Sequence, residues 1–307
     1  VSFEQKIDIN NANENKEMVI PILYSCYSRD RNLKPIVEDD LFILEEKKQK
    51  LKINVLSAET KPPVLSIFRG FSSPVIYKSD LSIDDYLFLF LNDNDYFTRW
   101  DSGQLLIRKI VKSRLENQSN TLLEEKFINA IRLSIKNLES TDPFFLSSLL
   151  TIPGLSELEL LFEKVDPISI YKESLKFQVL IGTEIFQDLS QLYENVLVNI
   201  NQPWPLGRGE RKLLARVWSY LALSGDLKVK RNCVDSIRNS SMTIARAALE
   251  ALKPLDSNET NEASDTFYGI WKENPVVLDS WFAYEASRPS NEGIYVIERL
   301  FSHSKFD

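Results

Sequence analysis

The chain has 307 residues, 43% of them hydrophobic and 26% charged, which is the composition of a globular protein with enough apolar side chains for about two domains. Its net charge of -7 and pI of about 5.1 repel phosphate backbones and argue against a nucleic-acid partner. No stretch reaches the roughly 18 uninterrupted apolar residues of a membrane span. Cys26 and Cys233 lie too far apart for a disulfide framework, so we expect both to be reduced and buried.

The N-terminal quarter reads as β-structure. Every second residue from Val1 to Ile9 falls on one face if the segment is extended, and the residues between them are mostly polar, which predicts a half-buried strand. A second apolar run, residues 18–27, contains Pro21, which indicates an edge strand or a bulge.

A charged connection, residues 45–50, separates Leu41–Leu44 from the alternating segment Leu51–Leu56, which predicts a hairpin between these two segments. We therefore expect residues 1–78 to form a small Ig-like antiparallel β-sandwich that is truncated at its N-terminus.

After Tyr77 the apolar period changes from 2 to 3.6. Ser82 is placed to cap a helix, with Asp84 and Asp85 in its first turn, and residues 86–91 are apolar all round, which predicts a deeply buried helix. Asp166-Pro167 indicates the start of the longest helix. Its apolar stripe consists of Phe177, Ile181, Ile185, Leu189, Leu192 and Val196.

About a dozen short helical patterns follow one another between residues 79 and 307. They predict a mainly α protein, in which stacked antiparallel helix pairs form a superhelix that we expect to be truncated at its end. No sequence repeat fits a named consensus. A loop with Gly207-Arg208-Gly209 could bind an anion, although an ordinary solvent loop is the preferred interpretation.

The residues that most enzymes need are missing. The single histidine, His303, excludes a two-histidine zinc motif and makes a histidine-dependent triad improbable, so we expect it to be a surface side chain. We expect the adjacent acids to be solvated or to cap helices. They are Asp39-Asp40, Asp84-Asp85 and Glu124-Glu125. The sequence therefore predicts no catalytic, cofactor-binding or metal-binding residue in this chain.

Two short motifs carry a structural prediction instead. Arg69-Gly70-Phe71 lies where the apolar period changes, and we interpret it as a domain hinge with Phe71 as its plug. Arg99-Trp100-Asp101 opens an amphipathic helix, where it places an indole on the core face and two charges that need partners. A structural ion network is favoured over substrate contact for this motif.

These motifs also carry a family resemblance. Pro63–Val75, followed by Phe97–Gln104, resembles the bacterial alanyl aminopeptidases, the aminopeptidase N group of the gluzincin zinc metallopeptidases. Weaker similarity continues at residues 161–168, 239–243, 271–274, 281–282 and 301–306.

The resemblance implies a parent enzyme with a zinc domain, a small β-sandwich and a C-terminal helical domain. The family's zinc ligands and the segment that holds the substrate amino terminus have no counterpart in this chain. We therefore expect the non-catalytic C-terminal portion of a zinc-dependent aminopeptidase, which covers the active-site chamber through which short peptides pass. The expected partner is the catalytic domain of the same polypeptide, in a cytoplasmic monomer.

The main alternative is a free-standing α-solenoid that binds other proteins, because the stacked helices alone would suit that role. A hydrolase that uses only carboxylates is a remote third possibility, since no acidic pair lies in a recognisable pocket-forming loop.

Overall fold

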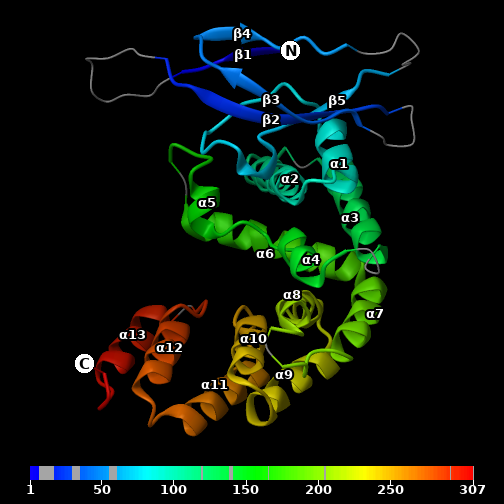
Figure 1. Ribbon diagram of the computed structural model, residues 1–307. Helices are drawn as coiled ribbons and strands as arrows, with labels where there is room; N and C mark the ends of the chain where they lie inside the picture. The colour runs from blue at the N-terminus through cyan, green and yellow to red at the C-terminus, as the bar shows by residue number, and fades with distance from the viewer. Residues whose placement is uncertain are drawn as a thin grey trace. The chain divides into compact units, whose positions relative to one another are not determined.

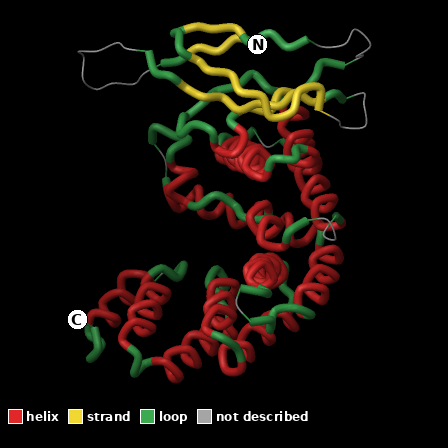
Figure 2. The backbone as a smooth tube through the Cα atoms, viewed as in Figure 1, coloured by secondary structure: helices red, strands yellow, loops and turns green. Residues whose placement is uncertain are grey.

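The computed structural model describes residues 1–6, 17–29, 35–54, 61–118, 120–137, 141–164, 166–203, 205–290 and 292–306. The chain divides into two compact units. Unit 1 contains Val1–Ser113 and Ser119–Ala130, and unit 2 contains Arg114–Gln118 and Ile131–Asp307. The described strands all lie in unit 1, and unit 2 is built of helices (Figure 2). The boundary that we predict at residue 78 falls inside unit 1 and stays a prediction.

Unit 1 contains two small antiparallel sheets. The larger has the strand order β3-β2-β5, with β2 in the middle, and the smaller pairs β1 with β4 (Figure 1). The strands are β1 Ser2–Glu4, β2 Ile20–Tyr27, β3 Pro35–Leu44, β4 Lys48–Lys50 and β5 Val64–Ile67.

Pro21 behaves as an edge residue although it lies in the middle strand. Its own strand pairs with β5 only from Tyr24 to Tyr27, so the backbone at Pro21 has a strand neighbour on one side alone. On the other side its carbonyl accepts hydrogen bonds from the hydroxyls of Ser72 and Ser73. Pro21 therefore costs no ladder hydrogen bond.

The predicted hairpin is wrong. Residues 41–44 pair with the start of β2, so that Leu44 lies opposite Ile20, whereas β4 pairs with β1. The strand expected from Val1 to Ile9 is present as β1, and Ile7 and Ile9 lie outside the described residues, as do Val55 and Leu56. An alternating pattern indicates a strand but does not show which other strand it pairs with, so the error is in the predicted pairing of these segments.

Three helices follow the strands. They are α1 Ile83–Asn92, α2 Tyr96–Leu115 and α3 Thr121–Lys136. Ser82 caps α1 as predicted, in a reciprocal capping box with Asp85, and Tyr86 and Phe90 are buried. Phe90 packs on Phe127 of α3, with ring centroids 5.5 Å apart.

Unit 2 continues as a curved succession of short helices (Figure 1). They are α4 Pro143–Leu149, α5 Leu155–Glu159, α6 Pro167–Glu184, α7 Phe186–Leu197, α8 Arg208–Leu223, α9 Leu227–Asn239, α10 Met242–Leu252, α11 Asn258–Trp271, α12 Pro275–Ala286 and α13 Gly293–Phe301. Helices α8, α9 and α10 pack on one another, and α11 packs on α9 and α12. The predicted mainly α fold, a helical superhelix after a small β module, is confirmed.

The predicted long helix from Pro167 is two helices. It breaks at Ile185, whose backbone (φ -116°, ψ 28°) leaves the helical region, although its apolar stripe stays buried on both sides of the break. Asp166 caps the first helix, as expected, by accepting hydrogen bonds from the backbone of Ile168 and Ser169. No helix in the described part of the chain is both long and apolar enough to span a bilayer.

Candidate functional site

Arg69, the charged residue of the first predicted motif, is deeply buried. It follows β5 in a short 3₁₀ turn, η1 (Arg69–Phe71), and only 2% of its surface is exposed. The backbone around it lies in the left-handed region at Phe68, Gly70 and Phe71, with φ of 55°, 59° and 58°. Such conformations cost free energy for residues other than glycine and persist where their surroundings hold them in place.

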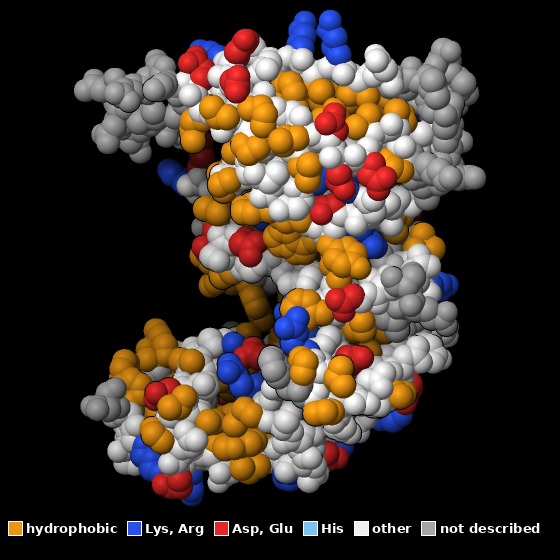
Figure 3. All heavy atoms as spheres, viewed as in Figure 1, with side chains coloured by type: hydrophobic (Ala, Val, Ile, Leu, Met, Phe, Trp, Pro, Cys, Tyr) orange, Lys and Arg blue, Asp and Glu red, His pale blue; other side chains and the backbone are white. Residues whose placement is uncertain are grey.

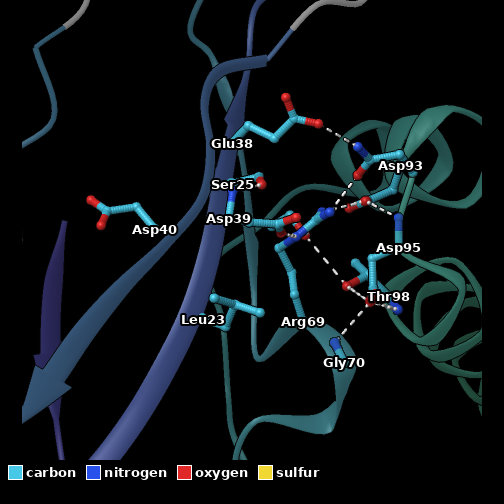
Figure 4. Close-up of polar contacts among 12 residues, drawn as sticks. Leu23, Ser25, Glu38, Asp39, Asp40, Arg69, Gly70, Asp93, Asp95 and Thr98 are labelled. Carbon is cyan, nitrogen blue, oxygen red and sulfur yellow. Dashed lines mark hydrogen bonds and ion pairs between the residues drawn. The ribbon is translucent and has the colours of Figure 1, made fainter.

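The guanidinium of Arg69 is surrounded by acceptors from three segments of unit 1 (Figure 4). Its Nε donates to Oδ1 of Asp39 at 2.7 Å, Nη1 donates to Oδ1 of Asp93, and Nη2 donates to Oδ1 of Asn94. Nη1 also lies 3.2 Å from the hydroxyl of Tyr27. Strand β2, strand β3 and the turn between α1 and α2 are thereby joined to the end of β5.

Burial and the neighbouring carboxylates together set the pKa values in this cluster. It disfavours the cation of Arg69, but the carboxylates of Asp93 and Asp39 outweigh it, so the pKa of Arg69 is raised. Burial, with Asp93 beside it, raises the pKa of Tyr27 to about 12 despite hydrogen bonding from the Asn94 backbone. Oδ2 of Asp93 is buried and accepts no hydrogen bond within the described residues. The cluster therefore stays charged on Arg69 and neutral on Tyr27 at neutral pH.

The second motif lies directly beside the first. The backbone N–H of Gly70 donates to Oδ2 of Asp95 at 3.1 Å, and the same oxygen accepts from the backbone and hydroxyl of Thr98 (Figure 4). The ring of Phe71 packs on that of Phe97, with centroids 5.2 Å apart. Two motifs that are separate in the sequence thus form one junction between β5 and α2.

The charged residues of the second motif find partners inside unit 1. Nε of Arg99 donates to the carbonyl of Phe90 at 3.0 Å, and burial lowers the pKa of Arg99. Asp101 accepts a 2.7 Å hydrogen bond from the hydroxyl of Tyr77. Trp100, the indole that we expect on the core face, is half-buried and packs on Phe97, with ring centroids 5.9 Å apart.

The prediction that Phe71 plugs a hinge is wrong. Phe71 is 56% exposed, and Arg69 and Phe68 are the buried side chains at this turn. The left-handed backbone at Gly70 and Phe71 turns the chain so that the guanidinium points inward and the phenyl ring outward. Sequence reasoning that ranks aromatic residues as core fails here because the acceptors that hold Arg69 come from distant segments.

The adjacent acids have different partners. Asp39 pairs with Arg69, Asp40 accepts from Tyr24, and Asp84 pairs with Lys126. Glu124 is buried, so the expectation that these acids are solvated or capping holds for only some of them. Asp85 does cap α1.

His303 is not a simple surface residue. Its Nε2 lies 2.9 Å from the hydroxyl of Tyr268, and its Nδ1 accepts the backbone N–H of Lys305. The ring packs edge-on against Phe282, with centroids 5.1 Å apart. It belongs to an aromatic cluster at the end of unit 2 and is half-buried, so the surface prediction holds only in part, because Tyr268 of α11 and Phe282 of α12 pack against one side of the ring.

The expected buried cysteines are found. Cys26 and Cys233 are both buried and free. Burial raises the pKa of the Cys233 thiol, which makes it unreactive.

Sequence reasoning missed Tyr27, Asp93 and Asn94. The only signal was the alternation of Asn and Asp over residues 92–95, which indicates a turn but not a partner for an arginine. In the junction the guanidinium of Arg69 lies between the carboxylates of Asp39 and Asp93. These ion pairs and hydrogen bonds hold the strands and helices of unit 1 together.

Two family models match the chain. One, described as a domain of unknown function (DUF3458) with an Ig-like fold, matches residues 1–80. The other, described as a domain of unknown function (DUF3458_C) with ARM repeats, matches residues 83–307.

Three of the relatives that the chain matches are called aminopeptidase N. The protein of Caulobacter vibrioides is 26% identical over 258 residues, which is 80% of this chain and 29% of that protein. Those of Escherichia coli and Haemophilus influenzae are each 24% identical, over 80% of this chain and 28% of their own length. The chain thus spans less than a third of the relatives that it matches.

The fold has a counterpart among solved structures. The crystal structure of Legionella pneumophila aminopeptidase A in complex with aspartic acid superposes with a TM-score of 0.83, at 23% identity, over 95% of this chain and 35% of that one. The chain belongs to the DUF3458 family, in which an Ig-like domain precedes ARM repeats, and it is homologous to the C-terminal region of aminopeptidase N.

Proposed function

We propose that this chain is the accessory region of a zinc-dependent aminopeptidase, in which it shapes and covers the chamber where short peptides lose their N-terminal residues. The observation that carries this proposal is the similarity to aminopeptidase N over 80% of the chain. The catalytic domain is then part of the same polypeptide, and we expect a monomer.

The residues that the structure describes offer no set of donors that suits zinc. In the described part of the chain, no three His, Cys, Asp or Glu side chains are grouped so that they could hold a metal ion. The zinc of the proposed enzyme is therefore held by residues outside that part. We assign Arg69, Gly70, Phe71, Arg99, Trp100 and Asp101 a structural role at the junction of β5 and α2, where Arg69 rather than Phe71 fills the interior.

An activity assay tests the proposal. The purified 307-residue chain should release no product from alanine p-nitroanilide, whereas the full-length gene product should, and a chelator should abolish that activity. Deletion of residues 83–307 from the full-length protein should raise its activity on folded substrates relative to peptides if the region covers the chamber. Chelator-sensitive activity of the 307-residue chain alone would refute the proposal.

A free-standing interaction scaffold is the second candidate, favoured by the ARM-repeat description, because such arrays present extended binding surfaces. The gene sequence upstream of Val1 discriminates between the two. A His-Glu-x-x-His motif there supports the peptidase, and a start codon at Val1 supports the scaffold.

A further inference from the structure

Three basic residues line one face of α8. Arg208, Lys212 and Arg216 are four residues apart, so they follow one another along that face. Arg208 is exposed and the other two are half-buried. Helix α8 packs against α4 (Figure 1). In the view of Figure 3, Lys and Arg side chains gather over the part of unit 2 where α8 and α10 lie.

Helix α4 supplies an aromatic surface for two of these cations. Nζ of Lys212 lies 3.7 Å from the ring centroid of Phe144, and Cζ of Arg208 lies 4.6 Å from the same centroid. Nζ of Lys212 also donates to Oγ of Ser148, whose hydroxyl donates in turn to the carbonyl of Phe144. These contacts hold the cations in place but do not neutralise their charge.

The positive charge of this face is uncompensated. Among the described residues, none of the three cations has a carboxylate within ion-pairing distance. Nε of Arg216 is buried without an acceptor in that part of the chain. The carboxylate of Asp142, whose Oδ1 lies 3.5 Å from the Cβ position of Gly209, accepts the backbone N–H of Phe144 as the N-cap of α4. Burial, and then the charges of Arg216 and Arg208, lower the pKa of Lys212.

We propose that Arg208, Lys212 and Arg216, held against Phe144, form a binding site for an oxyanion, either a carboxylate or a phosphate group. An oxyanion placed among them would accept charge-assisted hydrogen bonds and relieve their mutual repulsion. The carboxylate of a peptide and free inorganic phosphate share this chemistry. The site uses residues of α4 and α8 alone, so it stands whether or not the chain is part of a peptidase.

Calorimetric titration of the 307-residue chain at low ionic strength tests the site. The probes are inorganic phosphate, N-acetyl-trialanine with a free carboxylate, and the same peptide as its amide. We expect one-to-one binding of at least one of the two anions and none of the amide. Lys212→Gln should weaken binding about tenfold, since it removes one charge-assisted contact, while Lys212→Arg should retain it.

Lys109→Gln is the matched control, because Lys109 is an exposed lysine of α2 and the charge change is the same. Equal melting temperatures show that the variants are folded, and the exposed Arg208→Gln replaces Lys212→Gln if the latter melts early. Binding of phosphate alone identifies free phosphate as the ligand, and binding of the acid peptide alone identifies a peptide carboxylate. Absence of binding by both anions, equal binding of the amide, or equal weakening by Lys109→Gln overturns the site.

Discussion

The hydroxyl of Tyr77 donates a 2.7 Å hydrogen bond to Oδ2 of Asp101, which ties the segment after η1 to helix α2. Burial raises the pKa of Asp101, although the hydrogen bond from Tyr77 and the charge of Arg108 oppose it. Burial also raises the pKa of Tyr77, and Asp101 adds to that shift. The hydroxyl of Tyr77 therefore stays protonated, and ionisation of Asp101 costs more free energy in the folded protein than in water.

This pair predicts a pH-dependent stability. Because the folded pKa of Asp101 lies above its ordinary value of 3.8, its contribution is fully present at low pH and is lost as pH rises through the folded pKa. Asp101→Asn keeps an acceptor for Tyr77 and removes the titration. We expect the free energy of unfolding of the variant, relative to that of the wild type, to increase as pH rises from about 4 to 7 in urea titrations, because the wild type alone loses stability.

Asp166 supplies a control of opposite sign. Hydrogen bonds from Ser169 and from the backbone of Ile168 lower its pKa, so its contribution is present above the ordinary carboxyl pKa and is lost as pH falls. The free energy of unfolding of Asp166→Asn, relative to that of the wild type, should therefore decrease as pH rises. A pH-independent difference for Asp101→Asn would contradict the raised pKa.

Arg69 and Asp93 form a pair whose side chains are 3% and 0% exposed. Arg69→Met should lower the free energy of unfolding by about 3–5 kcal/mol, because it leaves the buried carboxylate of Asp93 without its cation. The measurement is chemical denaturation monitored by circular dichroism.

A control substitution and a double variant test whether the loss for Arg69→Met comes from its ion pair with Asp93. The exposed pair Lys126–Asp84 gives the control, and Lys126→Gln should cost less than about 1 kcal/mol. The double variant Arg69→Met with Asp93→Asn should recover part of the loss, since the uncompensated charge is gone. A loss for Arg69→Met no larger than that for Lys126→Gln would show that the junction does not depend on this pair.

The parts of the fold that local chemistry decides were predictable from the sequence. Ser82 and Asp166 cap helices at the positions where their side chains reach the next turn, and neither needs a distant partner. The stripe from Phe177 to Val196 is buried as its period requires. These features depend on residues within a few positions of each other.

The parts that depend on distant partners were not predictable. The pairing of β3 depends on the whole sheet. The break at Ile185 lies within an uninterrupted apolar stripe, and Gly182, three residues before it, stays inside helix α6 and so does not mark the break. The burial of Arg69 depends on Asp39 and Asp93, which are 30 and 24 residues away in sequence. The single sequence contains each of these residues but does not show that they meet.

The exposure of Phe71 gives a prediction that separates it from its neighbour Phe68. Phe71→Asn should change the free energy of unfolding by less than about 1 kcal/mol, because the ring is 56% exposed and Asn tolerates a left-handed backbone. Phe68→Ala should cost about 3–5 kcal/mol, because Phe68 is 7% exposed and packs with Ile22 and Leu44. Thermal melts of both variants compare their stabilities. A larger loss of stability for Phe71→Asn than for Phe68→Ala would support the original interpretation that Phe71 fills the interior.

Helices α6 and α8 approach each other closely at Gly182. A Cβ at this position would lie 2.7 Å from the carbonyl oxygen of Tyr220 and would also meet Oγ of Ser224. Gly182→Ala should therefore lower the free energy of unfolding by about 1–3 kcal/mol, because a backbone carbonyl within a helix cannot move aside as a flexible side chain can.

Gly269 is the matched control, since it also lies in a helix of unit 2 and an added Cβ there meets no atom within 4 Å. Gly269→Ala should leave stability unchanged or raise it by about 0.5–1 kcal/mol, through the better helix propensity of alanine. The two variants differ only in what the new methyl group meets, so urea denaturation of both isolates the packing of α6 on α8. Equal effects of the two substitutions would mean that α6 and α8 can move apart at Gly182 with no loss of stability, contrary to what the 2.7 Å approach to the carbonyl oxygen of Tyr220 predicts.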